Sequence, residues 1–250
     1  MCNMHVLITG ASSGLGAQLL ARFEDRGYHV TGTTHEEETL PDRDRGRFIP
    51  YNANDTHAAL GLVNTMCGMG IKAKGPVDLL INNAGTNAIR HFEDITLDFM
   101  EFIMRINCHS AVMLVRELLA MQRFAENAVV INIISDAAWR PMRHSAAYNL
   151  SKAALDMATK QMARELTKPK NLTILGVRPG KMHGTRMSTY IDNEVCSMRG
   201  WTPEEAHAYY AANSVTGREA NPADVARFIQ ELYENPLVRT MSGACIDLVG

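Results

Sequence analysis

The chain has 250 residues, of which 46% are hydrophobic, and its formal net charge is −2. This length allows one α/β domain with a large core, and the near-neutral charge gives no reason to expect binding to nucleic acid or to an acidic membrane surface. The five cysteines are scattered without metal-ligand or redox spacing, and no signal peptide or membrane-length apolar run is present, so we expect a cytoplasmic protein with reduced thiols and no metal site.

The first predicted element is a short apolar strand, His5–Thr9, followed directly by a glycine-rich turn. The turn runs from Gly10 to Gly16 with the spacing G-x-x-x-G-x-G and leads into a predicted helix over Ala17–Arg26, for which Gly27 is a suitable stop. A strand, a glycine-rich turn and a helix N-terminus together suit a pyrophosphate, because side chains at the glycines would block its close approach. The alternative is an ordinary glycine-rich turn.

Strand-like and helix-like segments alternate along the rest of the chain. Apolar, strand-like runs fall at 28–33, 47–51, 77–82, 128–134, 172–178 and 244–249. Helical patterns lie at 56–67, 97–124, 148–166, 203–213 and 222–234. This alternation indicates βαβ units, and so predicts an α/β fold with a doubly wound parallel sheet of Rossmann-like type in a single domain over residues 1–250.

Two helix starts and one long excursion stand out in the second half of the chain. Thr202-Pro203 and Asn221-Pro222 each place a capping residue before a proline at the first helical position. The segment from about 181 to 220 leaves the predicted sheet after one strand and returns late. We therefore expect this segment to form a lid over the site.

The run YNLSK places Tyr148 and Lys152 four residues apart in a predicted helix. That spacing puts both side chains on one face of the helix. A nearby cation favours the phenolate form of a tyrosine, so such a pair can exchange a proton with an alcohol or carbonyl near neutral pH. The alternative is an ordinary pair on a helix surface, and the choice depends on motifs elsewhere in the chain.

Several further motifs accompany this pair. They are TGASSGLG (9–16), NNAG (82–85) after the strand VDLLI, Asn107 in RIN, Ser135 thirteen residues before Tyr148, and Arg178-Pro179-Gly180. Because these motifs occur in this order and setting, the chain resembles the short-chain dehydrogenase/reductase superfamily in its shorter form. The resemblance covers the whole chain. The resemblance implies an oxidoreductase that transfers a hydride between a nicotinamide cofactor and a carbonyl or secondary-alcohol substrate.

The resemblance also implies roles for four catalytic residues. Tyr148 would be the general acid in carbonyl reduction and the base in alcohol oxidation. Lys152 would lower the pKa of this tyrosine and hold the nicotinamide ribose. Ser135 would hydrogen-bond the substrate oxygen, and the backbone at Asn107 would anchor a water near the lysine. Taken singly, Ser135 could instead cap a strand end, and Asn107 could be a helix residue bonded to its neighbours.

A cofactor-binding set follows from the same resemblance. It consists of Gly10, Ser12, Ser13, Gly14, Leu15 and Gly16 in the turn, Thr34, His35 and Asn52 after the next two strands, Asn83, Ala84 and Gly85 in NNAG, Tyr148 and Lys152, and Pro179, Gly180, Met182 and Thr185 after the sixth strand.

The choice between NADP and NAD depends mainly on the end of the second strand. Relatives that bind NAD usually carry an acidic residue there, whose carboxylate would repel a 2′-phosphate. Thr34 and His35 tolerate a phosphate better, so we favour NADP over NAD. Ser13 stands where many NADP-binding relatives carry a basic residue, and the run Glu36–Glu38 follows; both count against this preference.

Three positions depart from the family pattern. Asn52 replaces an aspartate that contacts the adenine, and an amide can still form that hydrogen bond. Gly184 stands where the family has a threonine and Thr185 follows it, so either the loop has one extra residue or the nicotinamide contact has changed. The end of the chain, Leu248-Val249-Gly250, lacks the paired glycine that often closes the last strand.

Substrate identity is open between two readings of the predicted mouth. Cations cluster in three segments expected to rim it: Arg90 and His91, then Arg140, Arg143 and His144, then His183 and Arg186. They could bind an anionic substrate or be solvated loop residues. The mouth could equally be an apolar pocket for an acyl chain, a steroid-like body or an aromatic ketone, formed by Trp139, Met142, Met182, Met187 and Trp201.

Other interpretations concern assembly and function. In relatives the helices near 97–124 and 148–166 form subunit contacts, so we expect a homodimer or homotetramer; alternatively they only cover the sheet. On the same fold, a non-redox nucleotide-binding sensor or regulator is the main alternative function. An epimerase or dehydratase with tightly held NAD is a second, and a ketone reducer of acyl thioesters is a subtype of the favoured reading.

Overall fold

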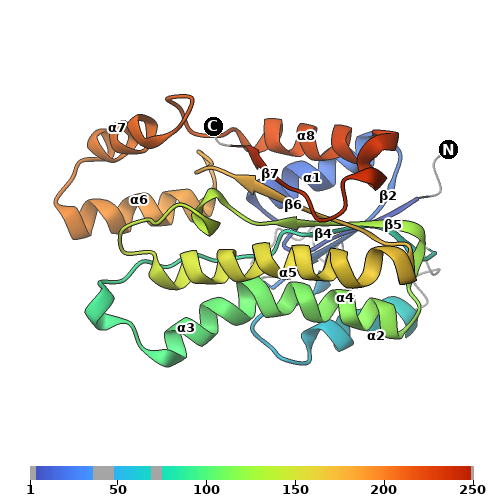
Figure 1. The fold of residues 1–250 in the computed structure, drawn as a ribbon. Helices are drawn as coiled ribbons and strands as arrows, with labels where there is room; N and C mark the ends of the chain where they lie inside the picture. Colours follow the sequence, from blue (N-terminus) through green and yellow to red (C-terminus); the bar gives the residue numbers. More distant parts are fainter. Residues whose placement is uncertain (1–3, 36–47, 69–74, 249–250) are drawn as a thin grey trace.

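The computed structural model describes residues 4–35, 48–68 and 75–248. At its centre lies a parallel sheet of seven strands in the order β3-β2-β1-β4-β5-β6-β7 (Figure 1). The strands are β1 (His5–Ile8), β2 (His29–Thr34), β3 (Phe48–Pro50), β4 (Val77–Asn82), β5 (Phe124–Ile133), β6 (Thr173–Pro179) and β7 (Cys245–Leu248). The strand order runs outward in both directions from the β1–β4 pair, which confirms the predicted doubly wound, Rossmann-like sheet.

Helices cover both faces of this sheet. The first face carries α1 (Gly14–Asp25) and α8 (Pro222–Glu234), and the second carries α2 (Ala58–Gly68), α4 (Ser110–Ala120) and α5 (Ala146–Lys170) (Figure 1). Parallel crossovers place helices in this way, which leaves the strands buried on both faces.

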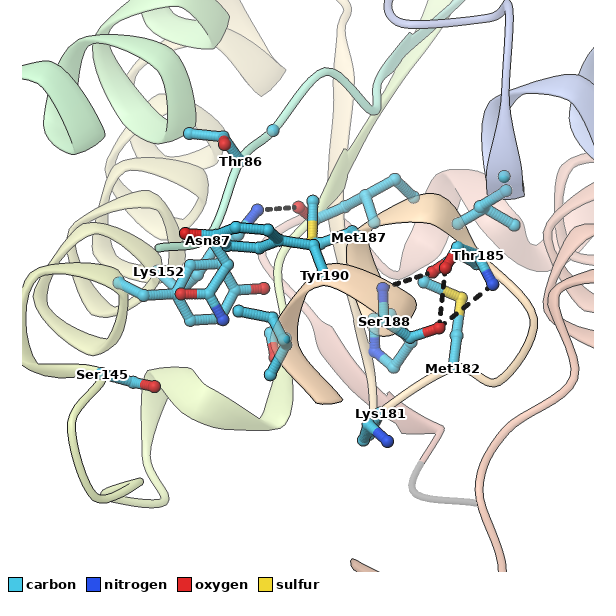
Figure 2. Close-up of a pocket in the computed structure, with 18 of the residues that line it drawn as sticks. Thr86, Asn87, Ser145, Lys152, Lys181, Met182, Thr185, Met187, Ser188 and Tyr190 are labelled. Atoms are coloured by element: carbon cyan, nitrogen blue, oxygen red, sulfur yellow. Dashed lines mark hydrogen bonds between the residues drawn. The ribbon is translucent and has the colours of Figure 1, made fainter. Parts of the chain in front are cut away.

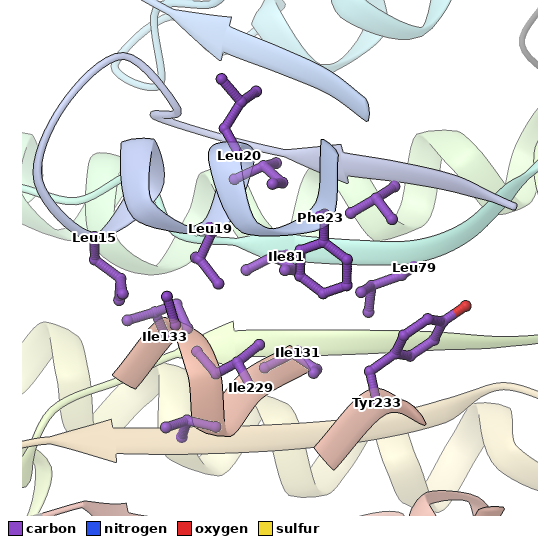
Figure 3. Close-up of a cluster of buried hydrophobic side chains, with 14 of the residues drawn as sticks. Leu15, Leu19, Leu20, Phe23, Leu79, Ile81, Ile131, Ile133, Ile229 and Tyr233 are labelled. Atoms are coloured by element: carbon purple, nitrogen blue, oxygen red, sulfur yellow. The ribbon is translucent and has the colours of Figure 1, made fainter. Parts of the chain in front are cut away.

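The core divides into two clusters because successive strand residues point to opposite faces of the sheet. Ile8 and Ile81 pair in register and pack under α1 and α8, against Phe23 and Tyr233 (Figure 3). The preceding pair, Leu7 and Leu80, points to the other face and packs with α2, α4 and α5. The continuous apolar runs of the sequence therefore reflect burial on two faces.

The helix ends follow from local chemistry. Gly27 has a φ of 81°, in the left-handed region, directly after the end of α1. Thr202 accepts a hydrogen bond from the Glu205 backbone at the start of α7 (Pro203–Asn213), and Asn221 accepts one from Ala223 at the start of α8. These two predicted starts are confirmed.

The predicted helix over 97–124 is wrong as a single element. It consists of α3 (Leu97–Met104), a π-helix η4 (Arg105–His109) and α4, and the chain is already in β5 at Phe124. In the π-helix the Ser110 N–H donates to the Arg105 carbonyl, five residues back, which accommodates one extra residue in the turn.

Residues 181–220 form a helical excursion beyond the sheet, made of α6 (Arg186–Arg199) and α7. The two ends of the excursion meet: Met182 and Ala220 form a parallel bridge, and the Ala220 N–H donates to the Lys181 carbonyl at 2.8 Å. Lys181 also forms ion pairs with Asp192 at 2.7 Å and with Glu219 at 2.5 Å. α6 was not predicted, and the predicted runs at 47–51 and 244–249 extend to positions outside the described residues.

Candidate active site

A cavity of about 960 Å³ lies at the carboxyl ends of the strands. This is the edge of an open α/β sheet where ligands bind, beside the point at which the strand order reverses. The structure brings to its wall seventeen of the predicted site residues: Gly10, Ser12, Ser13, Gly14, Leu15, His35, Asn52, Asn83, Ala84, Gly85, Ser135, Tyr148, Lys152, Pro179, Gly180, Met182 and Thr185. The other three, Gly16, Thr34 and Asn107, lie behind this wall and support it.

The glycine-rich turn leaves no room for side chains at its centre. A Cβ placed on Gly16 would lie 2.0 Å from the carbonyl oxygen of Gly10. The turn is fixed to the next loop by Asn83, whose Nδ2 donates to the carbonyls of Thr9 and Gly10 at 3.0 Å each. Ser13, the N-cap of α1, makes no capping hydrogen bond with its side chain, so the helix N-terminus presents backbone N–H groups to the cavity.

The second and third strands end at the far part of the same cavity. Thr34 is buried, and its Oγ1 lies 2.9 Å from Ser12 Oγ, so it supports the turn. His35 and Asn52 line the wall directly. Asn52 Oδ1 accepts from the Asn54 N–H at 3.1 Å, which orients the Asn52 amide. The run Glu36–Glu38 lies outside the described residues.

Ser135, Tyr148 and Lys152 converge on one region of the wall. Ser135 follows the end of β5, and the other two stand one turn apart on α5, with all three side chains buried. The Tyr148 side chain is hydrogen-bonded to Ser135. Lys152 Nζ donates to the carbonyl oxygen of Ile133 at 2.9 Å and lies 5.8 Å from the centre of the Tyr148 ring. Figure 2 shows Lys152 on the α5 side of the cavity, and Thr185 and Ser188 on the α6 side.

Burial governs the proton affinities of this pair. It raises the pKa of Tyr148 to about 12, while the hydrogen bond to Ser135 acts in the opposite direction. It lowers the pKa of Lys152 to about 8. Burial is the largest contribution to the pKa of Tyr148 and Lys152 is not among its causes, so the expectation that Lys152 lowers this pKa stays a prediction.

Asn107 lies in the π-helix η4 and fixes the loop after NNAG. Its Oδ1 accepts from the Thr86 N–H and its Nδ2 donates to the Thr86 carbonyl, both at 2.8 Å. The same Nδ2 lies 2.9 Å from Ser151 Oγ on α5. The side chain thus ties three elements together behind Lys152, and the backbone role implied by the resemblance, anchoring a water near the lysine, stays a prediction. π-Bulges of this kind occur frequently at functional sites.

Thr185 answers one question left open by the sequence. It is the N-cap of α6, where its side chain and that of Ser188 form a capping box (Figure 2). A Cβ placed on Gly14 would lie 3.6 Å from Thr185 Cβ, so the threonine reaches the glycine-rich turn. Thr185 therefore lies at the cavity although Gly184 stands before it, which agrees with a loop that has one extra residue.

Sequence reasoning missed several residues of the cavity wall. Asp136 follows Ser135, is buried, and accepts from the Ser135 hydroxyl at 3.1 Å. Burial raises its pKa, against the opposing effects of Ser135 and Arg140. Asn87 Oδ1 is buried without a hydrogen-bond partner among the described residues. The place of Asn87 two residues after NNAG could have identified it as a residue of the cavity wall. Arg199 and Tyr190 lie on α6, so their place on the wall could not be predicted without that helix.

The predicted cations separate into groups. Arg140, Arg143 and Arg186 line the main cavity. Arg90, His91 and His144 line a smaller neighbouring cavity of about 360 Å³, to which Arg143 also contributes. His183 lines neither. Of the predicted apolar set, Met142, Met182 and Met187 line the main cavity, while Trp139 and Trp201 do not.

Within the described ranges no group of three or more His, Cys, Asp or Glu side chains is arranged to hold a metal ion. None of the described helices combines the length and apolar character needed to cross a bilayer.

Comparison with known proteins gives the family. A family model described as short chain dehydrogenase matches residues 4–196. The chain belongs to the short-chain dehydrogenase family. It is accordingly an oxidoreductase of the short-chain dehydrogenase/reductase type, as the motifs predicted.

The relatives agree over most of their length. The chain is 26% identical to a short-chain dehydrogenase/reductase, FrzI, of a Cladobotryum species, with 91% of this chain and 88% of the relative covered. It is 30% identical to D-erythrulose reductase of Gallus gallus, with 70% of each covered. Among solved structures, an actinorhodin polyketide ketoreductase variant with NADPH has a TM-score of 0.84 at 22% identity and covers 99% of this chain and 96% of its own. At that identity the likeness concerns the fold.

Proposed function

We propose that this chain transfers a hydride between a nicotinamide cofactor and a carbonyl or secondary-alcohol substrate, with Tyr148 as the general acid and base. The observation that carries the proposal is the convergence of Ser135, Tyr148 and Lys152 on one cavity at the carboxyl edge of the sheet. Relatives with reductase names, and solved neighbours crystallised with NADPH or NADH, support it.

The residues present fit a dinucleotide. The space that a side chain at Gly16 would take is filled by backbone, the N-terminus of α1 opens onto the cavity, and Asn87 Oδ1 is a buried acceptor without a partner among the described residues. We assign the phosphates to Ser13–Leu15 and Thr185, and the nicotinamide ribose to Lys152. The bound cofactor supplies the hydride, and the protein sets the position of the substrate.

Each catalytic side chain then has a task. Tyr148 gives its proton to the substrate oxygen during reduction. Ser135 turns its hydroxyl from Asp136 to the same oxygen and orients it. Lys152, with a pKa of about 8, is charged at neutral pH and stabilises the phenolate left on Tyr148. Asn107 keeps the loop at Thr86 in place beside them.

We further propose NADP as the preferred cofactor. The second strand ends in the neutral Thr34, with His35 on the cavity wall, and the described wall carries no carboxylate there to repel a 2′-phosphate. A higher kcat/KM with NADPH than with NADH supports this preference, and a strong preference for NADH contradicts it.

Residues 181–220 are proposed to act as the lid of the site. Residues from the start of α6, the end of α6 and from α7 line the cavity: Thr185, Arg199 and Tyr210. The ion pairs of Lys181 to Asp192 and Glu219 hold the base of the excursion together. Closure of such a segment excludes water from a hydride-transfer site.

The proposal includes a cytoplasmic homodimer or homotetramer without nucleic acid or membrane as partner. Exposed apolar side chains on α3, α4 and α5 support self-association. They are Phe102 on α3, Met113 on α4, and Leu150 and Met157 on α5, and the Met157 side chain is 62% exposed. Light scattering tests this, and a monomer at micromolar concentration contradicts it.

The decisive experiment compares Tyr148→Phe with the wild type. A panel of carbonyls and alcohols is followed by nicotinamide absorbance with both cofactors. We expect Tyr148→Phe to lose turnover by roughly 10²-fold or more and to keep cofactor binding. Tyr28→Phe, which removes a phenol oxygen bonded to Glu234 away from the cavity, is the matched control. Full activity in Tyr148→Phe would refute the proposed role.

A further inference from the structure

The arginines of the main cavity differ in their partners. The cavity is lined by Arg140, Arg143, Arg186, Arg199 and Arg218. Arg140 lies 3.9 Å from Asp136 and donates to the carbonyl of Asn213. Asp136 and Glu219 are the carboxylates that the described residues bring to this wall, and Glu219 is paired with Lys181. Both acids are therefore already matched with cations.

Arg143 and Arg199 have no such match. Like that of the exposed Arg218, their side chains form no ion pair or hydrogen bond with any residue in the described part of the chain. Arg199 Nε is buried and lacks an acceptor there. An unpaired donor on a charged group is costly, so the guanidinium of Arg199 has hydrogen-bonding capacity that the described residues leave unused.

Aromatic rings hold Arg199 in place. Its guanidinium carbon lies 4.6 Å from the centre of the Trp201 ring and 5.0 Å from that of Tyr209. The two rings are 5.1 Å from each other, centre to centre, so they flank the cation from one side and contribute a cation–π attraction. Trp201 is itself packed against Ile89, Ile191 and Val195, which anchors it. The cation is therefore positioned in advance of any ligand.

The two arginines reach the wall of the same cavity from segments that are distant in the sequence. Arg143 lies between β5 and α5, and Arg199 is the last residue of α6. Both act on His144: after burial and His91, they lower the pKa of this imidazole, while Glu93 acts against them. Like charges gathered at one wall repel each other, and an anion placed between them removes that repulsion.

We propose that Arg143 and Arg199 bind an anionic group of the substrate, a carboxylate or a phosphate, so that the enzyme acts on acidic oxo or hydroxy compounds. The proposal rests on the proposed function, since it names the substrate class for the same cavity. A planar guanidinium suits either oxyanion because it donates two parallel hydrogen bonds. The cofactor phosphates are assigned elsewhere, to the N-terminus of α1.

The test uses pairs of compounds that differ only in charge. 2-, 3- and 4-Oxo acids are compared with their methyl esters, and dihydroxyacetone phosphate with dihydroxyacetone. We expect kcat/KM for the charged member to exceed that for its neutral twin by roughly 10- to 100-fold. Arg143→Gln and Arg199→Gln should each lower kcat/KM for the charged member far more than for its neutral twin, and so remove most of this preference. The two families of compounds distinguish carboxylate from phosphate.

The control is Arg164→Gln, an exposed arginine of α5 away from the cavity, which should keep the preference. Equal kcat/KM for charged and neutral twins overturns the proposal. So does a preference for acids that survives both substitutions. A rise in cofactor KM in Arg199→Gln, with the preference intact, would assign the arginine to the cofactor and equally refute the proposal.

A binding measurement separates this proposal from the proposed function. The chain has two tryptophans, so Trp139→Phe leaves Trp201 as the sole emitter beside Arg199. Titration of this variant with the oxo acids should change its fluorescence, and Arg199→Gln in the same background should abolish the response. If fluorescence reports acid binding while no compound is turned over, the anion site stands and the proposed function fails. If neutral ketones are turned over and no acid binds, the reverse holds.

Discussion

Replacement of Gly16 by alanine tests how the glycine-rich turn is built. The added Cβ would lie 2.0 Å from the Gly10 carbonyl oxygen, 2.7 Å from Asn83 Nδ2 and 2.9 Å from Ala11 Cα. Two of these atoms belong to backbone, so the turn must open. Opening breaks the two Asn83 hydrogen bonds, at about 1 kcal/mol each, and adds an overpacking cost of about 1–3 kcal/mol. We therefore expect the free energy of unfolding to fall by about 3–5 kcal/mol.

Two measurements follow this change. Urea unfolding reports the stability, and titration with NADPH, followed by cofactor fluorescence, reports the affinity for the cofactor. This affinity should fall at least about tenfold, because the displaced backbone N–H groups no longer point at the phosphates. Gly61→Ala is the matched control: a Cβ there meets nothing within 4 Å, and alanine in α2 should stabilise the protein by up to about 1 kcal/mol. An unchanged urea midpoint in Gly16→Ala would refute the packing argument. Lost stability with intact affinity would refute the assignment of the phosphates to this turn.

Three other changes test separate parts of the site. Because the pKa of Lys152 is lowered from 10.5 to about 8, the unfolded chain binds more protons than the folded chain between these pH values; the free energy of unfolding should then rise with pH there by up to about 1.4 kcal/mol per unit, in urea titrations without added cofactor. Lys152→Met should abolish that rise, and the exposed Lys168→Met should keep it. Asn107→Ala strands the Thr86 N–H and carbonyl and should lower the free energy of unfolding by about 2–4 kcal/mol; a urea midpoint equal to that of the wild type would contradict this. His35→Asp should shift the ratio of kcat/KM from NADPH toward NADH by about tenfold or more, since a carboxylate repels the 2′-phosphate; an unchanged ratio would count against the cofactor assignment.

Motifs in the sequence located most of the cavity because they sit at strand ends. Ser135, Asn83 and Gly180 each follow a strand, and parallel strands bring their carboxyl ends to one edge, so the residues had to meet. Tyr148 and Lys152 joined them through a helical spacing that the structure confirms.

What escaped prediction depended on three-dimensional context. α6 has a polar sequence, RMSTYIDNEVCSMR, without a clear helical periodicity of apolar residues. Its capping box uses Ser188 in place of the usual glutamate or glutamine, so the usual cap pattern did not predict the helix either. The π-helix at Asn107 differs from an α-helix in which backbone groups are hydrogen-bonded, and its amino-acid composition gives no sign of that difference. The pKa values of Tyr148 and Lys152 depend on burial, which spacing alone does not give.

The paired ends of the excursion over 181–220 make it a unit that enters and leaves the sheet at one place. Since Lys181 and Ala220 are hydrogen-bonded neighbours, the intervening chain starts and finishes at one place on the sheet edge. Insertions, deletions or a wholesale exchange of α6 and α7 therefore leave β6 and α8 where they are, provided this junction is kept. Selection, or an engineer, can in this way change which molecules enter the cavity, provided that Thr185, which lies beside Gly14, is kept with the junction.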